Sequence, residues 1–181
     1  STDEKTTEDT IVATDNGPDR PAIGTVEVPM GIKTTFEERY PRAINVKWDR
    51  PDTNWVIEWE WSGWPVLDTA AYVASFNWDN ADHWTWYDAM GNWVGTVSNV
   101  SDYTTLPAPV NFSLNKQYNG YTITSVKKEN DKNRTMYEIT IEKGNDKGKL
   151  LIDENGKILK KKINSGGTTT KEKTNPKDSG Y

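Results

Sequence analysis

An internal repeat is the feature that most constrains what this chain can fold into. Apolar residues and a proline near the start recur in the same order 78 positions later, and a second gap-free block recurs 65 positions later. The matched pairs are Val28 and Leu106, Pro29 and Pro107, Ile32 and Val110, Phe36 and Leu114, Tyr40 and Tyr118, Trp48 and Val126, Tyr72 and Tyr137, Phe76 and Ile141, Asp88 and Asp153, and Gly91 and Gly156. Because the offset falls from 78 to 65, the first copy contains 13 more residues, inserted between Trp48 and Tyr72. The repeat therefore predicts one structural unit made twice.

Each copy begins with the pattern of a short amphipathic helix. A proline precedes three apolar residues spaced four apart, which would share one face of a helix. These residues are Ile32, Phe36 and Tyr40 in the first copy, and Val110, Leu114 and Tyr118 in the second. Pro41 and Gly120 are expected to end the two helices.

Alternating apolar and polar residues follow each helix and predict strands. The expected ranges are 43–49, 55–61, 71–78, 82–88 and 93–99 in the first copy, and 121–128, 134–143, 148–153 and 157–163 in the second. The last hairpin of each copy turns on Asp-x-x-Gly, in which Asp starts the turn and Gly accepts a positive φ. One helix against one face of an antiparallel sheet, made twice in tandem, is an α+β architecture.

The two ends of the chain lack this periodicity. Residues 1–24 carry six acids against two bases, and residues 165–181 are rich in Gly, Thr, Lys and Asp. Neither end can bury enough apolar surface to offset its chain entropy, so both are expected to be disordered. The expected division is a disordered acidic leader over 1–24, a first unit over 25–103 with its insertion near 49–71, a second unit over 104–164, and a disordered tail over 165–181.

Composition excludes several classes of protein. The chain has no cysteine and a single histidine, His83, so a disulfide framework and a thiolate metal site are excluded and a histidine-based triad is not expected. The net charge of −5 disfavours a nucleic-acid partner, since such domains concentrate Lys and Arg. No apolar run approaches the roughly 20 residues of a membrane-spanning helix. No catalytic residue, metal or cofactor is predicted.

Several stretches together resemble one protein family. VP…F…RYPRAINVKW, the Trp-rich strands and YDAMGNWVGT are followed by LPAPV…YNGY…YEITI…LLIDENGKIL. In this order they resemble the PepSY-like, beta-lactamase-inhibitor-like domain of exported Gram-negative proteins, over about residues 26–163. The resemblance implies tandem helix-plus-sheet units and a location in the periplasm, or on a membrane as a lipoprotein, after removal of a signal peptide. It carries no catalytic residues. The family of beta-lactamase inhibitory proteins uses disulfides, which this chain lacks, so the resemblance implies a mode of contact without a particular target.

The second copy serves as a control for the tryptophans of the first. By position, Trp84 and Trp86 match Lys149 and Leu151, whereas Thr85 and Tyr87 match Leu150 and Ile152. Leu150 and Ile152 are more naturally buried than Lys149, so Trp84 and Trp86 are predicted to lie on the open face of the sheet. Trp78, whose counterpart is Lys143, is placed with them. Trp48 and Trp93 match Val126 and Ile158 and are predicted to be core.

The insertion contains the stretch NWVIEWEWSGW at 54–64, for which two interpretations stay open. Trp59 and Trp61 would share one face of a strand, while Glu58 and Glu60 would share the other. The strand is either half-buried, with its acids in water, or part of an aromatic binding surface that the second copy lacks.

These patterns predict a non-enzymatic exported binding module. Its partner would be an envelope or secreted protein, such as a peptidase, and its effect would be inhibitor-like. The predicted contact residues are Trp59, Trp61, Trp78, Trp84 and Trp86, with Glu58 and Asp82 at the rim. A carbohydrate-binding module using the same tryptophans is the alternative, with Asp79, Asn80 and Asp82 accepting sugar hydroxyls. Catalysis by Glu58 and Glu60 is disfavoured, because acids alternating with buried aromatics explain them more simply.

Overall fold

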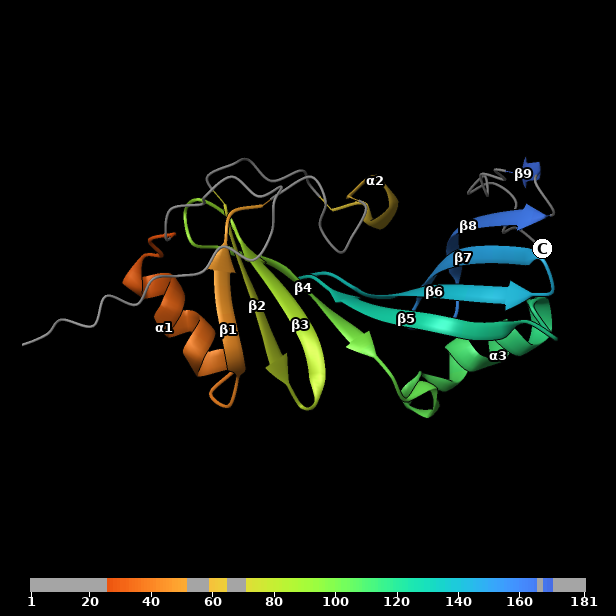
Figure 1. The fold of residues 1–181 in the computed structure, drawn as a ribbon, viewed down its shortest axis with the longest axis horizontal. Coiled ribbons are helices and arrows are strands. Elements are labelled where there is room, and N and C mark those ends of the chain that lie inside the picture. The colour runs from red at the N-terminus through yellow and green to blue at the C-terminus, as the bar shows by residue number, and fades with distance from the viewer. Residues whose placement is uncertain (1–25, 52–58, 65–70, 166–167, 171–181) are drawn as a thin grey trace, which may run out of the picture.

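A single antiparallel sheet forms the body of the protein (Figure 1). The computed structural model describes residues 26–51, 59–64, 71–165 and 168–170. Within these ranges nine strands follow chain order across the sheet, so each strand pairs with the next one along the chain. The strands are β1 (Ile44–Asp49), β2 (Tyr72–Trp78), β3 (Ala81–Tyr87), β4 (Trp93–Val100), β5 (Thr122–Asn130), β6 (Thr135–Lys143), β7 (Asp146–Asp153), β8 (Ile158–Ser165) and β9 (Thr168–Thr170).

Two ten-residue helices, α1 (Met30–Arg39) and α3 (Ala108–Gln117), cover the same face of this sheet. In the first half, Ile32 and Phe36 of α1 pack against a cluster of strand residues: Tyr72, Ala74, Phe76 and Tyr87. In the second half, Val110 and Leu114 of α3 pack against the equivalent cluster: Val126, Tyr137, Ile139, Ile141, Leu150 and Ile152. Strand pairing carries one face continuously from Ala74 through Thr85 to Thr96, and from Val126 to Ile139. We call this the helix face and the opposite one the far face.

The two halves place equivalent residues in equivalent positions. Each helix begins after a proline and ends at a tyrosine, whose N–H donates to the carbonyl of Phe36 in α1 and of Leu114 in α3. The first half then continues as the four antiparallel strands β1–β4, and the second as β5–β8 with the short β9 added at the edge. The α+β prediction is therefore correct in its elements. The sequence predicted two separate sheets. The structure has one continuous sheet, because β4 pairs with β5 from Thr96 to Val100.

The Asp-x-x-Gly turns form as predicted. Asp88 Oδ1 accepts hydrogen bonds from the backbone N–H groups of Met90 and Asn92 at 3.0 and 2.8 Å. Asp153 Oδ1 accepts the equivalent pair, both at 2.9 Å. Gly91 and Gly156 then adopt φ values of +87° and +84°, a conformation that favours glycine.

Two predicted segments differ from the structure. Residues 55–58 of the expected strand 55–61 lie outside the described residues. The end of that segment belongs to a short helix, α2 (Trp59–Ser62), which is followed by Gly63 at φ +76°. The tail expected from 165 onward contains the end of β8 and the strand β9, which pairs with β8. Three consecutive threonines have high strand propensity and find an edge to pair with, which outweighs the polar composition. The expected leader, 1–24, lies outside the described residues.

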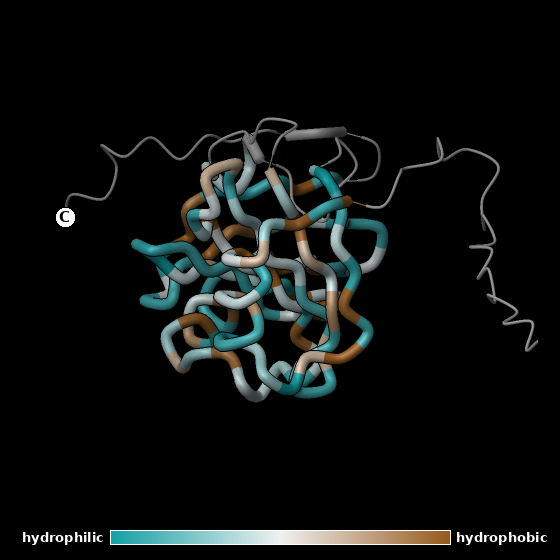
Figure 2. The backbone as a smooth tube through the Cα atoms, turned by 90° about the vertical axis from the view of Figure 1, so that its left-hand side faces the viewer, coloured by the Kyte–Doolittle hydropathy of each residue, from teal (hydrophilic) through white to brown (hydrophobic). Residues whose placement is uncertain are grey.

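The helix face holds the larger part of the core. Hydrophobic and hydrophilic stretches alternate along the backbone in Figure 2, as expected for strands with one face buried. Phe76 is buried on this face and packs edge-on against Phe36 of α1. Trp48 and Trp93 pack against the α1 core but remain half-buried. The indole N–H of Trp93 donates to the hydroxyls of Thr85 and Thr96 at 3.1 and 3.0 Å, which fixes this ring at the edge of the core.

Candidate functional site

The far face of β3 carries two of the predicted site residues, Trp84 and Trp86. Trp84 pairs with Ser75, which puts both tryptophan side chains on the side away from α1. The second half keeps this register, because Lys149 pairs with Thr140 at the same offset of 65. The face predicted for these two tryptophans from the repeat is therefore correct.

Trp86 is completely buried, because the segment around α2 lies over it. Trp64 packs edge-on against Trp86, with ring centroids 6.0 Å apart and an interplanar angle of 71°. Gly95 of β4 makes room for this contact, since a Cβ there would lie 2.6 Å from the Trp64 ring. Trp86 and Trp64 are only 0% and 5% exposed. The expectation of an accessible Trp86 is wrong, because residues of the insertion cover it.

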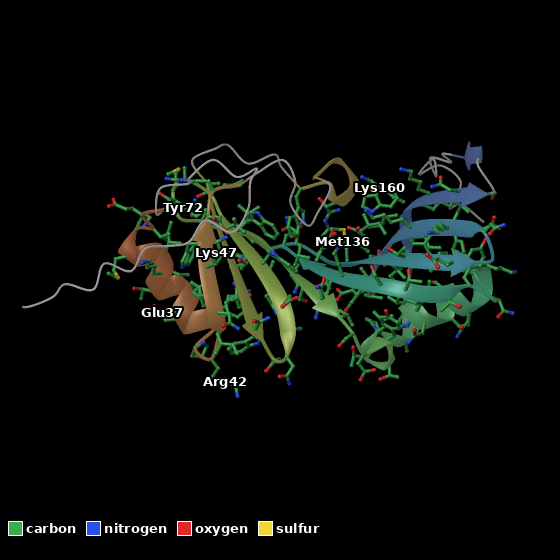
Figure 3. The ribbon with its side chains drawn as sticks, viewed as in Figure 1. Glu37, Arg42, Lys47, Tyr72, Met136 and Lys160 are labelled. Atoms are coloured by element: carbon green, nitrogen blue, oxygen red, sulfur yellow. The ribbon has the colours of Figure 1, made fainter. Side chains whose placement is uncertain are left out.

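Basic side chains from the second half hold α2 in place. Arg134 Nη2 donates a hydrogen bond of 2.7 Å to the carbonyl of Ser62. The ammonium groups of Lys149 and Lys160 lie 5.6 and 6.0 Å from the ring centroid of Trp61, and Figure 3 shows Lys160 on the side of the sheet where α2 lies. Half-buried Trp61 is thus engaged within the protein, as part of the cover over the far face.

A buried carboxyl pair lies in the same covered region. Glu129 and Glu138 are 0% and 5% exposed, and Lys149 Nζ lies 2.6 Å from Glu138 Oε1. Burial, followed by the hydrogen bond with Glu138 and its charge, raises the pKa of Glu129 to about 8 against the opposing charges of Lys149 and Arg134. Glu129 is therefore mostly protonated at neutral pH. Glu138 alternates along β6 with the buried Tyr137 and Ile139, a pattern typical of a strand with one face in water. Nothing in the sequence indicates that α2 covers that face.

Trp84 lies at the boundary between the covered and the open parts of the far face. It is half-buried and packs against the cluster that contains Trp64 and Trp86. On its other side is a shallow depression of about 180 Å³. The lining residues are Asn45, Ser75, Phe76, Asn77, Asp82, His83 and Trp84. Two predicted site residues, Trp84 and Asp82, are thus brought together.

A row of hydrogen bonds runs across three strands at this depression. Asn45 Nδ2 donates to Asn77 Oδ1 at 2.9 Å, and Asn77 Nδ2 donates to Asp82 Oδ1. Asn45 has a φ of +55° and lies in an irregularity of the β1–β2 pairing between Ile44 and Lys47. A non-glycine residue with positive φ is uncommon and directs its side chain away from the regular strand pattern. Asn45 and Asn77 were not predicted, because nothing in the sequence marks this bulge.

The remaining predicted site residues lie elsewhere. Trp78 is on the helix face, 5.5 Å from Tyr40 between ring centroids and beneath the Arg42 guanidinium at 5.3 Å. It shares that face with Phe76, two residues earlier, so its assignment to the open face is wrong. Glu58 lies outside the described residues, as does the side chain of Trp59. The structure therefore retains Trp84 and Asp82 as the open part of the predicted site.

The described residues contain no group of three or more His, Cys, Asp or Glu side chains that could hold a metal ion. Among the helices that the structure describes, none is long and apolar enough to cross a membrane. What the far face offers chemically is an aromatic ring beside acceptor oxygens, an arrangement suited to binding.

The fold defines an α+β protein in which two helices pack on one face of an antiparallel sheet. The chain belongs to the family described as "Putative beta-lactamase-inhibitor-like, PepSY-like", whose profile matches residues 70–160. The family resemblance noted in the sequence is therefore confirmed. No curated protein shows significant similarity to the chain.

Solved structures from Bacteroides species share the fold. A BLIP-like protein from Bacteroides fragilis has a TM-score of 0.60 and 24% identity, over 83% of this chain and 96% of that one. A DUF2874 family protein from Bacteroides ovatus has a TM-score of 0.57 and 20% identity, over 76% of this chain and 89% of that one. A structure from Bacteroides eggerthii, described as "putative periplasmic proteins", has a TM-score of 0.58 and 18% identity, over 76% of this chain and 90% of that one.

Proposed function

We propose that this chain is a non-enzymatic, exported protein-binding module that contacts its partner through the open part of the far face. The observation that carries the proposal is the half-exposed Trp84 beside the polar row ending at Asp82. Both long helices cover the other face, so the open part of the far face presents Trp84 at its edge, beside the depression. Aromatic residues anchored in a rigid sheet give large contact area at low entropic cost.

Family membership supports an inhibitor-like effect on an enzyme of the cell envelope. The family description and the BLIP-like relative from Bacteroides fragilis point to beta-lactamase-inhibitor-like proteins. The relative from Bacteroides eggerthii supports a periplasmic location, free or anchored as a lipoprotein. Binding is favoured over catalysis because the carboxyl pair of Glu129 and Glu138 is buried and shielded from any substrate.

The repeat supports a division into two tandem units, over 25–103 and 104–164. The matched helices and the identical β2–β3 and β6–β7 registers are its basis. In this proposal the first unit contacts the partner, and residues 59–64 of the insertion contact the second unit through Ser62 and Arg134.

An inhibition assay tests the proposed function. Purified chain is titrated against exported hydrolases, beta-lactamases first and peptidases next, and a photo-crosslinking residue is placed at Ser75, next to Trp84. The matched control is the same residue at Phe112, which is 67% exposed on α3 of the helix face. We expect saturable inhibition of one enzyme and a crosslink to it from position 75 only. Equal crosslinking from position 112, or no saturable binding across the panel, would contradict the proposal.

A further inference from the structure

The polar row beside Trp84 has a fixed direction. A carboxylate only accepts hydrogen bonds, so the side-chain amide nitrogen of Asn77 must face Asp82. The Asn77 oxygen then faces Asn45, which must donate through its own nitrogen. Each amide therefore directs one N–H along the row, and the row begins with the Asn45 side-chain oxygen and ends with the carboxylate of Asp82. Both ends of the row present acceptor oxygens.

Trp84 adds an aromatic surface next to the acceptor end of the row. It stands two residues after Asp82 on β3, so both side chains project from the far face. The depression between them, about 180 Å³, is smaller than the roughly 300 Å³ or more of typical small-molecule pockets. Its size suits one side chain of a larger partner.

Carboxylates stand at the depression. Asp82 lines it and is exposed. The nearby Lys47 is engaged with Asp49, its Nζ lying 3.6 Å from the carboxylate, so its charge is offset locally. Asp79, at the adjacent β2–β3 turn, is exposed and adds a further negative charge.

Acceptor oxygens, an indole ring and negative charge together fit a cationic group. We propose that this depression receives a single arginine side chain of the protein partner, an inference that rests on the proposed function. The guanidinium would donate to the carboxylate of Asp82 while its plane stacks on Trp84, since arginine combines planar donors with affinity for aromatic faces. A sugar hydroxyl can also donate to these oxygens, but it carries no charge to pair with the carboxylate of Asp82. The carboxylate therefore favours a cation over a glycan.

The experiment uses the full chain labelled with ¹⁵N and small probes. N-acetyl-arginine amide is titrated while the indole N–H of Trp84 and the side-chain amides of Asn45 and Asn77 are followed by NMR. N-acetyl-citrulline amide, which has the same shape without the charge, is the matched probe, and methyl glucoside tests the sugar alternative. We expect saturable shifts with the arginine probe and affinity at least about tenfold weaker with citrulline, because a charge-assisted bond is lost. The indole of Trp93, on the helix face, should not respond.

The variant Asp82→Asn should lower the affinity for the arginine probe by a similar factor of about ten. Asp82 is exposed, so its replacement should leave the fold intact. Equal binding of arginine and citrulline, no saturable shift with arginine, or saturation by methyl glucoside alone would overturn the inference. If the arginine probe fails while the crosslink from position 75 stands, the face binds protein through another anchor and the proposed function survives. If the crosslink fails while arginine binds, the depression is a cation site and the proposed function is lost.

Discussion

The two halves of the molecule share a helix face and differ on the far face. In both, a ten-residue helix presents two buried apolar residues to strands of matching register. On the far face, the positions of Trp84 and Trp86 in the first half hold Lys149 and Leu151 in the second. One side of the sheet therefore has the same packing in both halves, while the other side differs between them. This difference is the reason for placing the proposed binding surface on the far face.

The far face consists of a covered part and an open part. The segment around α2 buries Trp86 and the carboxyl pair and joins the first half to the second through Arg134 and Ser62. Trp84 lies beyond this cover, beside the depression. Two tryptophans that stand two residues apart on one strand thus have different roles, one in stability and one at a surface.

The largest expected effect is at Trp86. Trp86→Ala should lower the free energy of unfolding by about 3 to 5 kcal/mol, because it empties a fully buried site beneath Trp64. Its counterpart Leu151→Ala, also buried, should cost about 2 to 5 kcal/mol. Denaturant unfolding measures both. A cost below about 1 kcal/mol at Trp86 would mean that α2 does not cover the far face in solution.

The helix face should respond equally in the two halves. Phe36→Ala and Leu114→Ala each remove the buried contact of a helix with the sheet and should each cost about 2 to 5 kcal/mol. A single cooperative transition is expected for both variants, because β4 and β5 join the halves in one sheet. Two separate transitions in denaturant melts would show that the halves unfold independently.

The carboxyl pair predicts a dependence of stability on pH. The ordinary pKa of Glu129 is 4.5 and its folded value is about 8, so its protonated form is favoured in the folded state. Its stabilising contribution is complete below about pH 4.5 and is lost as the pH rises to about 8. Glu129→Gln should therefore match the wild type near pH 5 and exceed its stability at pH 9 by on the order of 2 to 4 kcal/mol.

The matched control for this prediction is Glu142→Gln. Glu142 lies on the neighbouring strand β6, with a side chain that is 40% exposed and 3.7 Å from Lys147. This variant should change the free energy of unfolding by less than about 0.5 kcal/mol, because an exposed ion pair contributes little. If the profiles of the Glu129 variant and the wild type coincide from pH 5 to 9, Glu129 is ionised at neutral pH and water reaches the pair.

Much of this architecture could be predicted from periodicity and the repeat. The helix positions of Phe36 and Leu114, the strands and the face of Trp84 and Trp86 all follow from local spacing. The burial of Trp86, in contrast, depends on Trp64 reaching Gly95, a contact between distant segments that no local pattern encodes. Trp78 was misassigned because Lys143, its counterpart, is solvated at a strand end, whereas Trp78 finds Tyr40 and Arg42 beside it. The row from Asn45 to Asp82 depends on a bulge, which alternation cannot reveal.

Of the two tryptophans on the far face of β3, Trp84 should have the smaller effect on stability, and its replacement separates folding from binding. Trp84→Ala removes a half-buried ring at the boundary of the cover and should cost less than about 1 kcal/mol, well below Trp86→Ala. The same variant should weaken inhibition of the partner enzyme at least about tenfold, as loss of an aromatic anchor does. Phe112→Ala, an exposed aromatic on the helix face, should change neither quantity. Parallel melts and inhibition titrations of the three variants decide the matter. A stability loss at Trp84 as large as at Trp86, with unchanged inhibition, would make both tryptophans core and remove the open surface on which the proposed function rests.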